Sequence, residues 1–185
     1  MTEFTGFPKI GRFSRNCTIT EKIDGTNAQI YIDLIADKFL VGSRSRWITP
    51  DNDNHGFAKW AYDHKEELIA GLGDGSHFGE WWGYGIRGGY GLKEKRFSLF
   101  NTFRWNAETT PACCNVVPVL YEGPFEEDGV LVGMNRAMNE LRTTGSRASP
   151  GFMKPEGIMI YHHASKAYFK KTLLKDEAPK GMVER

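Results

Sequence analysis

The sequence predicts an α+β fold built on antiparallel sheets, and three observations carry that prediction. Short segments alternate apolar and polar residues with the period of a half-buried strand. Most of these segments are separated by turn signals rather than helices, so neighbouring strands should run antiparallel. Two segments show helical spacing, and no repeat, low-complexity stretch or linker divides the chain. We therefore expect residues 1–185 to form one domain with a full-sized core.

The strands should begin only after an irregular lead-in, because Gly6, Pro8 and Gly11 interrupt any periodicity in residues 1–16. Strands are expected over residues 17–20, 28–33, 39–41, 77–82, 96–100, 116–121, 156–162 and 167–173. Trp81 and Trp82 should point to opposite faces of their strand, one into the core and one toward a groove. The glycine-rich stretch 83–91 should be a loop with unusual backbone freedom.

Two helices are expected among these strands. The first follows the polar stretch 51–54, which offers good N-cap residues, and should end near Gly71 and Gly73. Its apolar stripe consists of Phe57, Trp60, Ala61, His64 and Leu68. The second should span residues 127–142, after an acidic start that suits the helix dipole. Its buried face is expected to consist of Val130, Met134, Ala137, Met138 and Leu141. His64 and the methionines are interpreted as core residues, not as ligands.

The composition points to a globular protein outside the membrane. The net charge is +1, so no overall basic field indicates nucleic acid. The sequence lacks a run of 18 apolar residues and a signal-peptide pattern at its start, so neither a membrane span nor secretion is expected. Cys17 and the adjacent Cys113 and Cys114 are an odd count without zinc-type spacing. Reduced thiols and a cytoplasmic location are therefore expected.

Lys22 is the most informative residue of the sequence. It stands between two predicted strands and is followed by Asp24-Gly25, a strong turn signal because glycine accepts unusual backbone angles. A lysine at a strand end beside a tight turn is well placed to meet a phosphate. A surface hairpin with a solvated lysine would explain the same octet, so the interpretation depends on the motifs that follow it.

Those motifs occur in one order from residue 21 to residue 172. They are 21–27 (EKIDGTN), 43–44 (SR), 79–83 (GEWWG), 97–101 (FSLFN), 156–161 (EGIMIY) and 168–172 (YFKKT). The set resembles the covalent nucleotidyltransferases, which comprise ATP-dependent DNA and RNA ligases and mRNA capping enzymes. The EKIDGTN form is most similar to the RNA ligase branch. The resemblance implies a ligase-type adenylyltransferase domain, with two antiparallel sheets flanked by helices and a nucleotide groove between them.

The resemblance also implies a reaction. The amine of Lys22 would attack the α-phosphate of ATP to form a lysyl-AMP, which then passes to a 5′-phosphate RNA end and is displaced by a 3′-hydroxyl. A free lysine amine is almost wholly protonated at neutral pH, so nearby cations or partial burial must favour its reactive neutral form. Lys170 and a bound Mg²⁺ (or Mn²⁺) are the candidate cations. Phosphoryl transfer depends mainly on such charge neutralisation.

The family pattern assigns roles to further residues. Lys170 and Arg44 should act with Lys22 in catalysis, and Glu156 should hold the divalent metal. The cofactor site should include Glu80 on the ribose, Phe100 against adenine, and Glu21, Asp24, Asn27, Ile158 and Lys171. Other interpretations stay open: Glu80 and Glu156 could be surface acids, Phe100 a core aromatic and Arg44 a salt-bridge partner.

Two features depart from the wider family. Many relatives carry lysines at i and i+2 in the last motif, whereas Lys170 and Lys171 are neighbours and should point to opposite faces, leaving Lys171 toward solvent or nucleic acid. Thirteen residues follow Thr172, too few for an OB-type or other C-terminal domain.

The leading prediction is an ATP-dependent RNA ligase, with RNA repair among its possible roles. It is either self-sufficient or helped by a protein partner. A minimal DNA ligase, a GTP-using capping-type enzyme and an RNA-end-binding module without ligation are the alternatives.

Overall fold

The structure is a computed structural model in which residues 2–174 and 176–177 are described. The strands are β1 (Asn16–Lys22), β2 (Thr26–Asp33), β3 (Lys38–Gly42), β4 (Trp47–Ile48), β5 (Gly75–Gly83), β6 (Lys95–Leu99), β7 (Asn115–Val116), β8 (Val119–Pro124), β9 (Gly157–His162) and β10 (Ala167–Thr172). The helices are α1 (Phe57–Asp63), α2 (Lys65–Leu72) and α3 (Val132–Thr144), with a 3-10 turn η1 at Gly89–Gly91.

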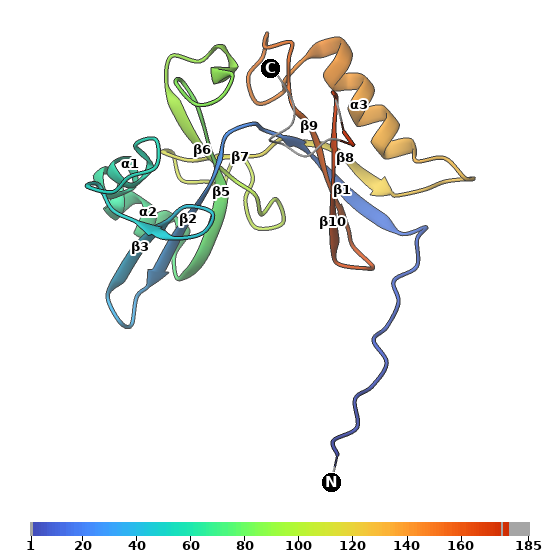
Figure 1. Ribbon diagram of the computed structural model, residues 1–185, viewed down its shortest axis with the longest axis horizontal. Coiled ribbons are helices and arrows are strands. Elements are labelled where there is room, and N and C mark those ends of the chain that lie inside the picture. Colours follow the sequence, from blue (N-terminus) through green and yellow to red (C-terminus); the bar gives the residue numbers. More distant parts are fainter. Residues whose placement is uncertain (1, 175, 178–185) are drawn as a thin grey trace.

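These strands form two sheets that lie in separate lobes (Figure 1). One has the order β10-β9-β1-β8 and carries α3 on its outer side, and the other has the order β4-β3-β2-β5-β6-β7 with α1 and α2 beside it. The predicted α+β class with two sheets and flanking helices is confirmed. The six-stranded sheet is not wholly antiparallel, however, because β6 and β7 run parallel.

The chain crosses between the two sheets twice. β1 belongs to the four-stranded sheet, β2 to β7 build the other sheet, and β8 to β10 return to the first. The first crossing consists of residues 23–25, which we call the crossing segment, and the second lies at Val117 and Pro118. The single strand predicted over 116–121 is therefore wrong. Pro118 has no N–H to donate to a ladder, while its carbonyl accepts a bond from the N–H of Glu21 at 2.9 Å.

The first predicted helix is divided at His64. The backbone there departs from helical geometry (φ −109°, ψ 16°), and the ring Nδ1 lies 2.8 Å from the carbonyl oxygen of Trp60. The helix start agrees with the sequence, since the carboxylate of Asp53 accepts bonds from the N–H groups of Ala58 and Lys59. Its end at Leu72, followed by Gly73, also agrees.

The second predicted helix begins later than expected. Asp128 and Gly129 have left-handed backbone conformations (φ 49° and 79°), and Glu127 and Val130 form an isolated β-bridge. The acidic stretch is therefore a turn, and α3 starts at Val132. Val130, which we assigned to the buried face, is 48% exposed, whereas the buried side of α3 contains Ala137, Met138 and Leu141.

Three apolar clusters hold the fold together. The largest packs α1 and α2 on the six-stranded sheet, and the second packs α3 on the four-stranded sheet. A small third cluster consists of Ile23, Trp82, Tyr90 and Val117, with Leu92, Ala148 and Phe152 packed against it. Because Ile23 and Val117 come from the two crossings, this third cluster fixes the junction between the sheets. Trp81 and Trp82 point to opposite faces of β5, as expected, and both are buried, Trp81 in the largest cluster and Trp82 in the third. That one of them lines the nucleotide groove stays a prediction.

The lead-in ahead of β1 is irregular, as expected, and extends away from the lobes as an arm (Figure 1). Its large apolar side chains are exposed, with Phe4 at 91% and Phe7 at 87%. None of the helices in the described part has the length and apolar run that crossing a bilayer requires.

Candidate active site

Lys22 is the last residue of β1 and lies where the chain leaves the four-stranded sheet. It does not begin a hairpin, because β2 pairs with β3 and β5 in the other sheet. The next residue, Ile23, is buried in the third cluster against Trp82. The hairpin interpretation of this octet is therefore wrong. The sequence instead forms a crossing segment at the junction of the two sheets.

Gly25 is required for space at this crossing. A Cβ at position 25 would lie 2.4 Å from the carbonyl oxygen of Trp81 and 2.7 Å from the Cβ of Trp82. Gly25 is not among the described glycines with left-handed backbone angles. The expectation that a glycine is needed here for its unusual backbone angles is therefore wrong. Its N–H donates to Oε1 of the buried Glu80 at 2.9 Å. The crossing segment therefore packs directly against β5.

The loop between β5 and β6 holds the crossing segment from the other side. The hydroxyl of Tyr90 accepts a bond from the N–H of Asp24 at 2.9 Å. Arg87 Nε donates to the carbonyl of Gly25 at 3.4 Å and lies 3.7 Å from Oδ1 of Asp24. Both Arg87 and Tyr90 have positive φ (51° and 53°), a conformation that costs about 1–3 kcal/mol and persists only where the surroundings impose it. The glycine-rich loop therefore holds in place the segment that directly follows Lys22.

Lys22 and Glu156 form a close ion pair. The Nζ of Lys22 lies 2.6 Å from Oε2 of Glu156, and the two side chains are 16% and 13% exposed. The register of β1 against β9 places Lys22 opposite Gly157, which brings the end of β1 beside Glu156. The structure thus joins the predicted nucleophile and the predicted metal ligand, which are 134 residues apart in the sequence.

Strand pairing separates the two neighbouring lysines of β10. Lys170 pairs with Met159 of β9, which pairs with Thr20 of β1 on its other side, and Thr172 is connected in the same way through Gly157 to Lys22. Directly paired residues present their side chains on one face, so Lys170 shares the face of Lys22 and Lys171 has the opposite face. Lys171 is 3.2 Å from Oδ2 of Asp176. The expected division between the two lysines agrees with this register.

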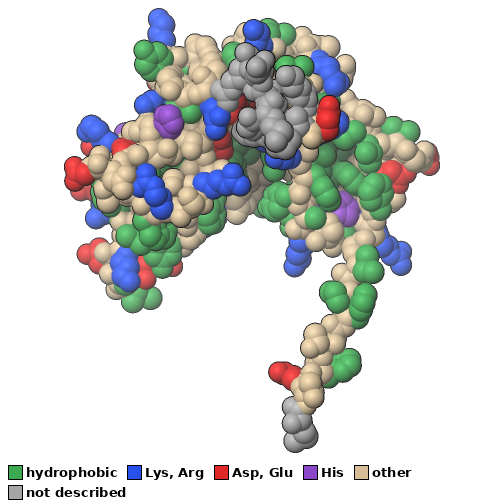
Figure 2. Space-filling model, viewed as in Figure 1, with side chains coloured by type: hydrophobic (Ala, Val, Ile, Leu, Met, Phe, Trp, Pro, Cys, Tyr) green, Lys and Arg blue, Asp and Glu red, His purple; other side chains and the backbone are tan. Residues whose placement is uncertain are grey.

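The remaining predicted cofactor residues divide between the two lobes. Asn27, Glu80 and Ser98 are directly paired across β2, β5 and β6, so their side chains share one face of the six-stranded sheet. Phe100 comes directly after β6 and is 40% exposed. Arg44 is exposed in the loop between β3 and β4. Figure 2 shows the surface to be hollowed between the two lobes.

Glu21 and Ile158 lie on the opposite face of the four-stranded sheet from Lys22. They pair directly across β1 and β9, and Ile158 is fully buried in the cluster under α3. The carboxylate of Glu21 accepts bonds from Ser146 Oγ at 2.5 Å and from the N–H groups of Arg147 and Ala148 at 2.8 and 2.9 Å. These bonds anchor the loop after α3. Lys171 lies in the same row, so the register gives no support for the expected contact of Glu21, Ile158 or Lys171 with a cofactor, and that contact stays untested.

The carboxyl of Glu21 gives a testable dependence of stability on pH. Burial raises the pKa of Glu21 from its ordinary value of 4.5, although its three hydrogen bonds oppose that change. The stability that this group contributes is therefore full below pH 4.5 and is lost as the pH rises through the raised folded value. Glu21→Gln should remove this dependence, because the amide is neutral and can still accept the two backbone bonds. Urea melts at several pH values should show the variant gaining stability relative to the natural protein as the pH rises.

Glu21→Ala is the matched variant for this prediction. It leaves the donors of Ser146, Arg147 and Ala148 without an acceptor in a buried place and should lower the free energy of unfolding by about 3 kcal/mol. Equal destabilisation by Gln and Ala would contradict the proposed bonding of the carboxylate.

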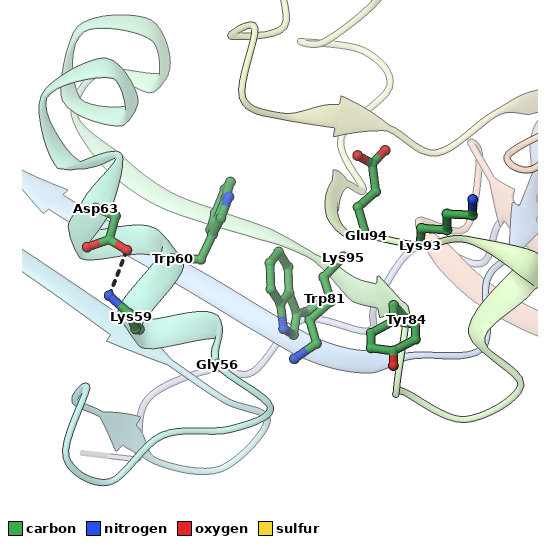
Figure 3. A pocket seen from close by; sticks show the side chains of 9 residues that line it. All are labelled: Gly56, Lys59, Trp60, Asp63, Trp81, Tyr84, Lys93, Glu94 and Lys95. Carbon is green, nitrogen blue, oxygen red and sulfur yellow. Dashed lines mark hydrogen bonds and ion pairs between the residues drawn. The ribbon is translucent and has the colours of Figure 1, made fainter.

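A pocket of about 370 Å³ lies elsewhere (Figure 3). It opens between α1 and the end of β5, and it is lined by Trp81, whose ring also contacts Phe57 of α1. Lys59 and Asp63 pair at 3.1 Å on its rim, and Lys95 donates to the carbonyl of His55 at 2.7 Å. None of the predicted site residues lines this pocket, so the candidate site is defined by strand register and contacts instead.

Sequence reasoning missed several residues that shape the site. Tyr90, Arg87 and Ser146 contact the residues next to Lys22, yet each lies more than 60 residues away in the sequence. Their local sequence carries no sign of this role, because the contacts arise only when loops from three parts of the chain meet at the junction. The crowding of glycines at 83–91 was the one available signal.

Comparison with known proteins agrees with this arrangement. A sequence model of the RNA ligase family matches residues 15–175. A comparison with curated proteins gave no match. Among solved structures, a mutant RNA ligase of Naegleria gruberi with AMP and Mn has a TM-score of 0.62 at 20% identity, covering 85% of this chain and 49% of that chain. The same ligase with PPi gives 0.60 at 18% identity, covering 86% and 50%. Another mutant with ATP and Mn gives 0.58 at 18% identity, covering 85% and 48%.

These structural likenesses establish the fold, and the chain spans about half the length of the Naegleria chains that it matches. The family itself rests on the sequence match, which extends from the start of β1 to beyond β10 and includes every predicted site residue. The chain therefore belongs to the RNA ligase family.

Proposed function

We propose that this protein is an ATP-dependent RNA ligase that works through an adenylate on Lys22. The observation that carries the proposal is the position of Lys22, held 2.6 Å from Glu156 at the junction of the sheets with Lys170 on the same face. Membership of the RNA ligase family supports it. The similar Naegleria ligase has been solved with ATP, AMP, PPi and Mn, which are a nucleotide substrate, products and a metal of such a reaction.

The reaction has three displacements at phosphorus. The amine of Lys22 attacks the α-phosphorus of ATP, the bond to pyrophosphate breaks, and the amine loses a proton. A 5′-phosphate oxygen of the RNA then attacks the adenylate phosphorus and releases Lys22. Finally a 3′-hydroxyl attacks the activated 5′-phosphorus, the new phosphodiester forms and AMP leaves. Lys170 would neutralise charge on the phosphate oxygens, where a single positioned donor is worth about a hundredfold in rate.

The six-stranded sheet would bind the nucleoside. Glu80 and Asn27 share a face on which the ribose hydroxyls would find acceptors, and the half-exposed ring of Phe100 would stack on adenine. Arg44 would contact the phosphate at the RNA end. Asp24, held by Tyr90 and near Arg87, would keep the crossing segment in place while Lys22 reacts.

Glu156 is the residue that would hold a divalent cation, Mg²⁺ or Mn²⁺. Among the described residues, no group of three or more His, Cys, Asp or Glu side chains is arranged to bind a metal. A single carboxylate completed by ATP phosphates and water is nevertheless the arrangement that Mg²⁺ commonly adopts with nucleotides, so the residues fit. When bound, the cation would offset negative charge on the phosphate oxygens.

Intact-mass measurement tests this proposal. After incubation with ATP and Mg²⁺ or Mn²⁺, the protein should gain one adenylate that is lost in acid, as expected of a bond between nitrogen and phosphorus. GTP in place of ATP should give no adduct. Joining of 5′-phosphorylated RNA, and not of the matching DNA, should follow. Absence of an adduct under all these conditions would refute the proposal, and a GTP adduct or joining of DNA alone would replace it with one of the two other enzyme classes.

A further inference from the structure

Several aromatic side chains lie together on one face of the four-stranded sheet, farther along the strands from the candidate active site. The rings of Tyr161 and Tyr168 are 4.7 Å apart, and the ring of His163 lies 5.5 Å from that of Tyr161. Phe103 comes from the other sheet, in the loop that follows β6 and reaches between the lobes in Figure 1. Its ring lies 5.8 Å from Tyr161 and 5.4 Å from His163. We call these four residues the aromatic platform.

The platform shares its face with Lys22. Tyr161 pairs with Thr18 of β1 and with Tyr168 of β10, and Thr18 lies four residues before Lys22 on the same strand. Side chains two and four positions apart on a strand point the same way, so this row lies about 14 Å along the sheet from Lys22. Lys170 stands in the row between them, paired with Met159. One continuous surface therefore leads from the proposed nucleophile past a cation to the aromatic rings.

This surface is not part of the core. Phe103 is 65% exposed and Tyr168 is 70% exposed, while Tyr161 and His163 are half-buried. His163 is held in place by Thr18, whose Oγ1 lies 2.9 Å from the ring Nε2. Exposed aromatic rings clustered beside a reaction site, and supplied by both lobes, are typical of a binding surface.

The chemistry of the surface fits a single-stranded nucleic acid. An unpaired base offers both of its faces to aromatic rings, and each such stack is worth about 1–3 kcal/mol. Bases inside a duplex are already stacked and paired and cannot lie on side chains. Lys170 would meet a backbone phosphate between the reacting end and the stacked bases. The net charge is only +1, so no overall basic field favours binding of a duplex through its backbone.

We propose that the aromatic platform stacks unpaired bases of the RNA strand next to the end being joined, which makes single-stranded RNA ends the substrate class of this ligase. The proposal rests on the proposed function for the identity of the strand, while the binding itself can be measured without any reaction. The register of β1, β9 and β10 carries it, since that pairing sets Tyr161 and Tyr168 on the face of Lys22.

The experiment uses the full chain and a fluorescently labelled, 5′-phosphorylated single-stranded RNA, alone or annealed to its complement. Tyr161→Leu/Tyr168→Leu should weaken binding of the single strand by at least about tenfold, the equivalent of one lost stack. Binding of the duplex should hardly change. Tyr84→Leu is the matched control, because Tyr84 is 64% exposed and lies in the pocket of Figure 3, away from the platform. It should bind both probes like the natural protein.

Two further measurements separate the possible failures. Tyr168→Leu alone, at a strongly exposed position, should weaken single-strand binding without altering the melting temperature, which distinguishes lost stacking from misfolding. Adenylate formation on Lys22 should be unchanged in all the platform variants. If the adduct forms but the double variant binds the single strand normally, or loses both probes equally, the platform is refuted and the ligase function stands. If no adduct forms in any protein but single-strand binding is still lost, the ligase function is refuted and the platform stands.

Discussion

Lys22→Arg is expected to abolish the adenylate adduct completely. The arginine side chain keeps the positive charge and can still pair with Glu156, which lies 2.6 Å from the lysine nitrogen. A guanidinium does not lose its proton under protein conditions, so it cannot supply the neutral nitrogen that must attack phosphorus. Intact-mass analysis after exposure to ATP and a divalent cation measures the outcome directly. This substitution keeps the positive charge at position 22 and removes the nucleophile, so it distinguishes the two roles of the lysine.

Lys22→Ala completes this test. It should also form no adduct, but it removes the Lys22 cation from beside the carboxylate of Glu156, whose side chain is only 13% exposed. Breaking a buried pair by removing one partner is destabilising, so Lys22→Ala should melt at a lower temperature than Lys22→Arg. An adduct of normal yield in either variant would show that a different residue carries the nucleotide.

The fold was largely predictable because its local signals are strong. Alternating segments such as residues 28–33 formed strands, and Gly73, directly after Leu72, ended a helix where expected. Errors arose where tertiary contacts override a local pattern. The apolar run at 116–121 looks like one strand, but the chain changes sheets at Pro118. The acidic start before α3 looks like a helix terminus, but left-handed residues at Asp128 and Gly129 make it a turn.

Part of the candidate site was predictable from the sequence, whereas the contacts that support it were not. The types of Lys22, Glu156 and Lys170 pointed to phosphate chemistry, and strand alternation distinguished Lys170 from Lys171. The supports of the crossing segment could not be found from the sequence, because they depend on distant loops meeting at one junction. The bond from Asp24 to Tyr90 spans 66 residues, and the bond from Ser146 to Glu21 spans 125. Gly25 is an example. The residue type suggested a turn, but glycine is required at this position because a Cβ would lie 2.4 Å from a carbonyl oxygen of β5.

The neighbouring lysines of β10 allow a prediction in which fold and chemistry are tested together. Lys170→Ala should slow adenylate formation by about a hundredfold or more, because it removes a cation from the face on which Lys22 reacts. Lys171→Ala should change the rate by less than about fivefold, since it loses only a half-exposed pair with Asp176. Single-turnover measurements with ATP in excess give both rates. The two variants alter the net charge equally and differ by one position, so a general electrostatic effect would slow both alike. Similar losses in both variants, or a larger loss in Lys171→Ala, would contradict the register of β10 against β9 and with it the placement of the phosphate beside Lys22.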